Sequence, residues 1–174
     1  MSWLRRFAAR LSGTAELPAD FAGALTADEQ VLAAARCSDG PLVATDLGLW
    51  LPGGRRLGWH LISKATWNDG VLVVVEAAES VAAGEAVLLR DLPPSRFPVT
   101  EPGRLPEVVH ARVTGSIRGT EHRELAVGGA RFVRRKVPGR DGLVLQVRPD
   151  PGTDEAALVP VAEEVARRLR RPAP

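Results

Sequence analysis

The stretch that most constrains the fold runs from Leu42 to Glu76, where apolar and polar residues alternate between strong turn signals. A period of two places apolar side chains on one face of a strand and polar side chains on the other. The segments 52–54 (Pro-Gly-Gly) and 68–70 (Asn-Asp-Gly) supply the turns, because glycine accepts the positive φ of a tight turn. Together with Val31–Cys37, this stretch predicts an antiparallel sheet of four strands.

The parity of the alternation also predicts where three of the four tryptophans lie. Trp59 and Trp67 fall on the apolar side of a predicted strand over 56–68, which indicates core positions. Trp50 has the opposite parity from the leucines on either side of it. We therefore expect Trp50 to be partly exposed, as an interface residue would be.

His60 and Lys64 fall on the polar face of the same predicted strand. They could line a polar groove at the mouth of a barrel, where a small ligand or a substrate would bind. A solvated strand face explains them more simply, because one face of an antiparallel sheet is usually polar.

The remaining elements are short and separated by glycine and proline. Strands are predicted over 86–90 and 143–148, and a hairpin over 120–127 and 130–137 around Gly128-Gly129. The segment 105–117 fits either a helix or an alternating strand, and Pro106 at the first helical position favours the helix.

The chain ends in a predicted amphipathic helix with arginines near its C-terminus, where they suit the helix dipole. Pro160 lacks a backbone N–H, so the regular helix is expected to start near Val159. One apolar stripe faces the core, formed by Leu158, Val161, Ala162, Val165 and Leu169.

Two blocks of this pattern, ATDLGLWLP at 44–52 and WHLISKATW at 59–67, resemble bacterial pleckstrin-homology-like (PH-like) domains. More narrowly, they are similar to blocks in uncharacterised actinobacterial proteins. The resemblance covers about 28–171 and implies a mainly β (α+β) fold, a split barrel of about seven antiparallel strands capped by a C-terminal helix. The first hairpin offers Arg36 beside Asp39, so the resemblance does not extend to the basic hairpin of phosphoinositide-binding members.

The expected organisation is an N-terminal helix and linker over 1–27, one PH-like domain over 28–171 and a tail over 172–174. The short helix over 1–13 is amphipathic and basic, so it could rest on an anionic membrane surface. Docking of its apolar face on the domain is the favoured alternative, because so short a helix offers little apolar area. The side chains involved are Trp3, Leu4, Arg5, Arg6, Phe7, Arg10 and Leu11.

Charge is distributed unevenly along the chain. Residues 11–104 carry seven basic and twelve acidic side chains, whereas residues 118–148 carry eight basic and three acidic ones. A solvated hairpin is the favoured explanation of the densest basic cluster, and the alternative is binding to phosphate groups or an acidic protein. Nucleic-acid binding is disfavoured because Phe132 is the one aromatic residue in the cluster. The cluster comprises Arg131, Arg134, Arg135, Lys136 and Arg140.

The chain contains none of the common nucleophile, phosphate-loop or zinc-protease motifs, and its three histidines have no metal-ligand spacing. We therefore predict no enzyme activity, no cofactor and no metal. The lone Cys37 fits a reducing compartment, so the expected location is the cytoplasm, with peripheral membrane attachment as an option. The favoured function is a non-catalytic binding or scaffold module that contacts an unidentified protein partner. The alternatives are membrane association through the N-terminal helix and ligand binding or catalysis at the barrel mouth.

Overall fold

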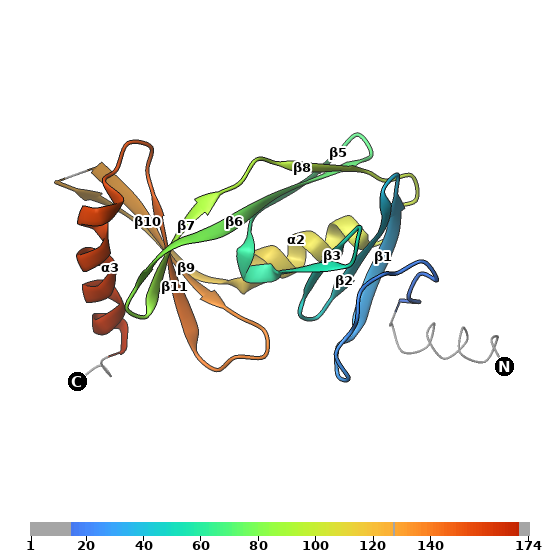
Figure 1. Ribbon diagram of the computed structural model, residues 1–174, viewed down its shortest axis with the longest axis horizontal. Coiled ribbons are helices and arrows are strands. Elements are labelled where there is room, and N and C mark those ends of the chain that lie inside the picture. Colours follow the sequence, from blue (N-terminus) through green and yellow to red (C-terminus); the bar gives the residue numbers. More distant parts are fainter. Residues whose placement is uncertain (1–14, 127, 171–174) are drawn as a thin grey trace. The chain divides into compact units, whose positions relative to one another are not determined.

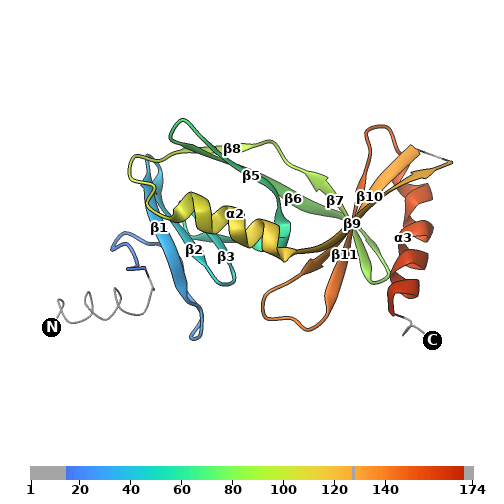
Figure 2. The same cartoon turned by 180° about the vertical axis from the view of Figure 1, so that it is seen from behind.

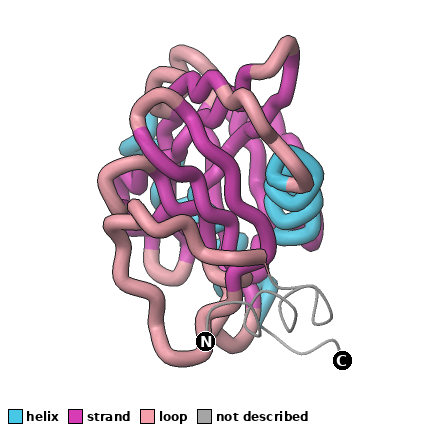
Figure 3. The backbone as a smooth tube through the Cα atoms, turned by 90° about the vertical axis from the view of Figure 1, so that its right-hand side faces the viewer, coloured by secondary structure: helices cyan, strands magenta, loops and turns pink. Residues whose placement is uncertain are grey.

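The computed structural model describes residues 15–126 and 128–170. The predicted N-terminal helix, with the seven side chains proposed to touch a membrane, lies outside the described residues, as does the predicted tail over 172–174. About half of the chain is strand, and strand is the commonest structure along the tube in Figure 3. The prediction of a mainly β chain is confirmed.

The described residues form two compact units, and the chain passes between them more than once. The first unit contains 15–76 and Pro93–Thr114, and the second contains Ala77–Leu92, 115–126 and 128–170. The predicted domain over 28–171 therefore contains parts of both units.

In the first unit, four antiparallel strands follow one another in sheet order: β1 (Val31–Cys37), β2 (Gly40–Thr45), β3 (Gly48–Leu51) and β4 (Arg55–Gly58). The first three are labelled in Figure 1. The sequence of 45–48 (Thr-Asp-Leu-Gly) favours a bend within the segment 42–51, and in the structure a turn at this point joins β2 to β3. The Thr45 hydroxyl closes this turn by accepting hydrogen bonds from the backbone N–H groups of Leu47 and Gly48, each at 3.2 Å.

The single long strand predicted over 56–68 is wrong, because a short 3₁₀ helix, η1 (Trp59–Leu61), interrupts it. The buried Trp59 indole donates a hydrogen bond to the carbonyl of Thr45 at 3.0 Å and turns the chain inward. After η1 the chain enters a second sheet through β5 (Ile62–Asn68) and β6 (Val71–Ala83). Residues 71–74 of β6 also pair with β8 (Ser95–Pro98).

The core of the first unit is completed by α2 (Leu105–Ser116), which confirms the helical alternative for this segment. Leu105, Val109 and Val113 are buried one helical turn apart, at a spacing of four residues. They pack against apolar side chains of β1, β2 and β3, and Figure 2 shows α2 in front of these strands.

The second unit contains a mixed sheet with the strand order β6-β7-β11-β10-β9. Its strands after β6 are β7 (Ala86–Asp91), β9 (Ile117–Leu125), β10 (Gly128–Lys136) and β11 (Leu143–Pro149). The predicted hairpin is confirmed as β9 and β10.

The prediction of a wholly antiparallel barrel of about seven strands is wrong. The described residues contain eleven strands, and β7 and β11 run parallel. More than 50 residues separate the end of β7 from the start of β11, so no hairpin dictates their direction.

One face of this sheet is covered by α3 (Glu155–Arg170), which begins before the predicted start near Val159. Asp154 caps the helix by accepting a hydrogen bond from the N–H of Ala156 at 2.9 Å. Pro160 sits inside the helix with its ring exposed. A proline so close to the helix start leaves one carbonyl, that of Ala156, without its i+4 donor.

Candidate functional site

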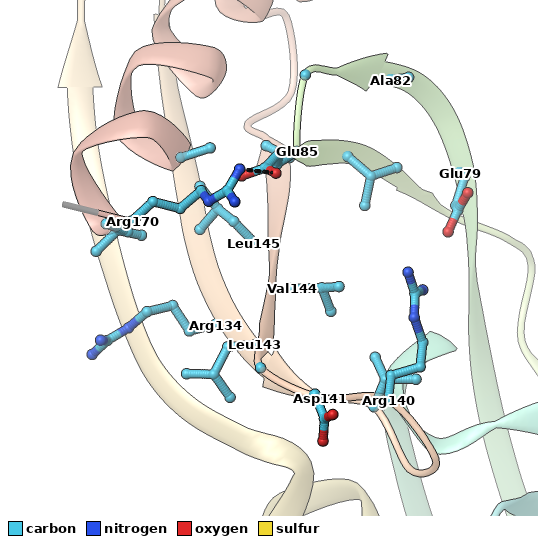
Figure 4. Close-up of a pocket in the computed structure, with 17 residues that line it drawn as sticks. Glu79, Ala82, Glu85, Arg134, Arg140, Asp141, Leu143, Val144, Leu145 and Arg170 are labelled. Carbon is cyan, nitrogen blue, oxygen red and sulfur yellow. Dashed lines mark hydrogen bonds and ion pairs between the residues drawn. The ribbon is translucent and has the colours of Figure 1, made fainter. Parts of the chain in front are cut away.

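A groove of about 790 Å³ lies in the second unit, beside the C-terminal end of α3. Strands β6, β7, β10 and β11, the loop between β10 and β11, and the last turn of α3 all contribute to its wall. Figure 4 shows the side chains that line it.

Part of the lining of the groove is apolar. Leu145 of β11 is aligned with Arg134 of β10 and with Ala86 of β7. At the N-terminal end of β11, α3 does not cover the sheet. Leu143 of β11 is therefore 49% exposed, and Leu169 of α3 is 51% exposed. These are two of the six large apolar side chains exposed among the described residues, and both line the groove.

The rim of the groove carries charges of both signs. Arg170 donates a hydrogen bond to the Glu85 carboxylate, and both side chains remain more than half exposed. Arg140 extends toward Glu79, and Asp141 lies next to Arg140 in the loop before β11 (Figure 4). Three arginines and three carboxylates line the groove, so its formal charge is balanced.

The basic cluster predicted from the sequence is divided by the alternation of β10. Arg134 and Arg140 line the groove, whereas Arg131 and Arg135 project from the opposite face of β10. Lys136 donates a hydrogen bond to the Arg140 carbonyl at 2.6 Å and so supports the loop. The five side chains therefore do not form one binding surface.

Arg135 is 2% exposed, although the sequence placed it on a charged hairpin. Its guanidinium donates a hydrogen bond to the hydroxyl of Ser116 at 2.7 Å. Burial, together with the nearby charge of Arg148, lowers the pKa of Arg135 to about 10. The side chain stays charged at neutral pH and contributes to the interior rather than to a binding surface.

The prediction that Trp50 is partly exposed is wrong, because it is 7% exposed. The segment before β1 covers it, with the Phe21 ring edge-to-face at 5.3 Å between ring centroids. The indole N–H of Trp50 donates a hydrogen bond to the buried carboxylate of Glu29 at 2.8 Å. Parity alone could not show that a segment covers the second face of the sheet.

Glu29 is the centre of a buried polar cluster that the sequence did not reveal. Its carboxylate accepts hydrogen bonds from the Thr45 hydroxyl at 2.6 Å, the Trp50 indole, and the Arg56 guanidinium at 2.6 Å. Burial by itself would raise the pKa of Glu29. The hydrogen bonds from Thr45, Trp50 and the Thr26 N–H, together with the charge of Arg56, lower that pKa below its ordinary value.

His60 and Lys64, which the sequence places on one polar strand face, lie on two different elements. His60 lies on η1, half-buried, and its ring packs against Gly58, where a Cβ atom would come within 2.7 Å of it. Lys64 lies beyond η1 on β5 and is exposed. Trp59 is buried as predicted, whereas the predicted core position of Trp67 is wrong, because that ring is 37% exposed.

Sequence reasoning missed the groove because its residues come from three distant parts of the chain, 79–87, 134–145 and 166–170. Leu169 belongs to the predicted apolar stripe of the last helix, and that stripe extends beyond the covered part of the sheet. The one available signal was a leucine in the stripe flanked by arginines at the very end of the helix.

No helix in the described part of the chain is long and apolar enough to cross a membrane. Within 15–126 and 128–170, no three histidine, cysteine, aspartate or glutamate side chains lie close enough together to hold a metal ion.

No protein-family model, curated protein or solved structure matches the chain, so the resemblance to PH-like domains stays a prediction.

Proposed function

We propose that the protein is a non-catalytic binding module and that the groove beside α3 receives an apolar side chain from a protein partner. The observation that carries the proposal is the exposure of Leu143 and Leu169 in one concave surface. Exposed apolar side chains that gather in a depression with a polar rim are typical of interaction sites.

The charges on the rim support a protein partner over a phosphate-bearing one. Arg170 is already hydrogen-bonded to Glu85, and Arg140 extends toward Glu79 (Figure 4). The guanidinium of Arg134 lies across Gly119, where a Cβ atom would come within 2.4 Å of it. A rim of balanced charge does not concentrate anions, but it suits a peptide that carries both acidic and basic residues around an apolar anchor.

Selection of a displayed random peptide library against the full chain tests this proposal. We expect the selected peptides to share a large apolar residue and to perturb the NMR signals of Leu143 and Leu169. Leu169→Asp should weaken their binding by roughly tenfold or more, because it places a charge where the apolar anchor is buried.

Leu92→Asp is the matched control, because Leu92 belongs to the same unit, is 39% exposed and does not line the groove. Its peptide affinity should equal that of the wild type. Equal loss of affinity in both variants, or selected peptides without an apolar residue, would contradict the proposal.

A further inference from the structure

Strand β1 ends the strand order of its sheet, and its outer edge is paired at two points. At one end, the N–H of Ala15 donates a hydrogen bond to the carbonyl of Val31 at 3.2 Å. At the other end, Cys37 forms a single bridge to Val99. Among the described residues, no strand pairs with this edge between the two points.

The part of this edge that can receive another strand is 33–36. The register between β1 and β2 shifts between Val31 and Ala33, and it is continuous from Ala33 to Cys37. In a regular antiparallel pair, alternate residues direct both backbone groups to the same edge. The outer edge of 33–36 therefore offers both N–H donors and C=O acceptors to an added strand.

The side chains of 33–36 do not protect the edge. Natural edge strands are commonly protected by proline, by a bulge or by long charged side chains. Residues 33–35 are alanines, whose methyl groups do not hinder the approach of a second backbone. The one long side chain, Arg36, is held by the Asp20 carboxylate through two hydrogen bonds, at 3.0 and 2.9 Å.

A groove of about 400 Å³ lies beside this edge and has an acidic lining. Leu17, which is 39% exposed, adds an apolar side chain to it. Glu16 and Glu101 supply two carboxylates, whereas the one cation of the lining, Arg36, already pairs with Asp20. The groove is lined by Ala34, Ala35 and Arg36 of β1, by 16–19, and by Glu101.

We propose that the outer edge of β1 over 33–36 binds an extended, basic segment of a partner protein, which adds as a strand. Main-chain hydrogen bonds to the edge supply affinity, and lysine or arginine side chains that reach Glu16 and Glu101 supply the preference for a basic partner. The same carboxylates repel phosphate groups, and two copies of this edge would bring like charges together. This inference is independent of the groove beside α3, because every residue in it belongs to the first unit.

Titration of the full chain with a short synthetic peptide of alternating lysine and valine, followed by NMR, tests the proposal. We expect saturable shifts of the amide signals of 33–36, with a dissociation constant of about 1 mM or lower. A peptide with glutamate in place of lysine should bind roughly tenfold more weakly or worse, because its charges face carboxylates.

Two N-methylated forms of the lysine peptide test strand addition with the protein unchanged. Each form carries methyl groups on the N–H groups of one edge of the extended peptide. One form should bind roughly tenfold more weakly, because it blocks the edge that faces β1, and the other should bind like the parent peptide.

Charge reversal tests the position of the groove, with circular dichroism used to verify that each variant is folded. Glu101→Lys should weaken binding of the lysine peptide about threefold or more, since it replaces an exposed attraction with a repulsion. Glu107→Lys is the matched control, an exposed acidic residue of the same unit that does not line the groove. Leu169→Asp, which alters the groove beside α3, should also leave the affinity unchanged.

Several results would overturn the proposal. The first is the absence of saturable shifts up to about 5 mM peptide. Equal affinities of the two methylated forms would exclude strand addition, and equal binding of the glutamate peptide would exclude the preference for a basic segment. Loss of binding in Leu169→Asp would assign the peptide to the groove beside α3. Amides of 33–36 that are already protected from hydrogen exchange without peptide would show that the edge is covered in the free chain.

Discussion

Single residues in this protein show how burial changes the role of a charged side chain. Glu29 and Arg135 are both buried, yet their surroundings act in opposite directions. Glu29 accepts several hydrogen bonds that favour its charged form, whereas desolvation and the nearby charge of Arg148 lower the pKa of Arg135. We therefore expect the Glu29 carboxylate to stabilise the first unit, and the buried charge of Arg135 to lower the free energy of unfolding of the second.

The stability of the first unit should depend on the charge of Glu29. The folded-state pKa of Glu29 lies below its ordinary value of 4.5, so its contribution is present above that pH and is lost as the pH falls through the folded-state pKa. At pH 7, Glu29→Gln should lower the free energy of unfolding by about 2 kcal/mol, because donors that served a carboxylate are left poorly paired.

Urea unfolding followed by tryptophan fluorescence at several pH values measures this effect. The difference between wild type and Glu29→Gln should shrink as the pH falls below the ordinary pKa, since the variant cannot titrate there. Asp28→Asn, an exposed neighbour, serves as the control. A difference that stays constant between pH 7 and pH 3 would show that the charge of Glu29 does not matter.

At the scale of elements, two segments depart from the regular structure that their local sequence favours. η1 interrupts a strand where Trp59 is drawn into the core, and α3 contains Pro160 within its first two turns. The helix tolerates this proline because the ring is exposed and Asp154 supplies a strong cap.

Pro160→Ala should stabilise the second unit by about 1–2 kcal/mol. Alanine restores the N–H that the Ala156 carbonyl lacks, and this gain is partly offset by the greater freedom of the unfolded chain. Thermal unfolding by circular dichroism measures the change. Pro151→Ala, in the exposed turn before α3, should have little effect. A destabilised Pro160→Ala variant would contradict this account of the helix.

At the scale of the whole molecule, two separate hydrophobic clusters are built from a chain that passes between them repeatedly. Val109 of α2 belongs to the cluster of the first unit and Val147 of β11 to that of the second. Residues 71–76 of β6 pair within the first unit, and residues 77–83 pair with β7 in the second. Neither unit is therefore one continuous segment of sequence.

Val109→Ala and Val147→Ala form a matched pair, since both side chains are fully buried and each change removes the same two carbon atoms. Each should lower the free energy of unfolding by about 1–3 kcal/mol. Because the two side chains belong to different clusters, their effects should add to within about 0.5 kcal/mol in the double variant. Denaturant unfolding measures all three variants, and an interaction energy above about 1 kcal/mol would mean that the clusters are coupled.

The local structure of this chain was largely predictable, because it depends on near neighbours in the sequence. Val31–Cys37 was predicted as a strand and is β1, and the hairpin around Gly128-Gly129 is β9 with β10. For the segment 105–117 the sequence left helix and strand open, Pro106 favoured the helix, and the structure has a helix over Leu105–Ser116. The error at η1 arose because the alternation continues through a segment whose backbone is bent by the burial of Trp59.

The candidate site was predictable in part. Arg134 and Arg140 were singled out from their charge density, and both line the groove. Glu85, Leu143 and Leu169 were not, because nothing local to any of them indicates the others. Arg135 was assigned to the same surface as Arg134, although adjacent residues of a strand project to opposite faces.

The sequence by itself determined the turns, the mainly β character of the chain and the apolar stripes of its helices, since these depend on backbone preferences and on periods of two and 3.6 residues. The tertiary structure decided which of those faces is covered. The segment before β1 buries Trp50 and Glu29, and α3 leaves Leu143 and Leu169 exposed at its end. Burial depends on which distant segments meet, and the same long-range packing created the groove.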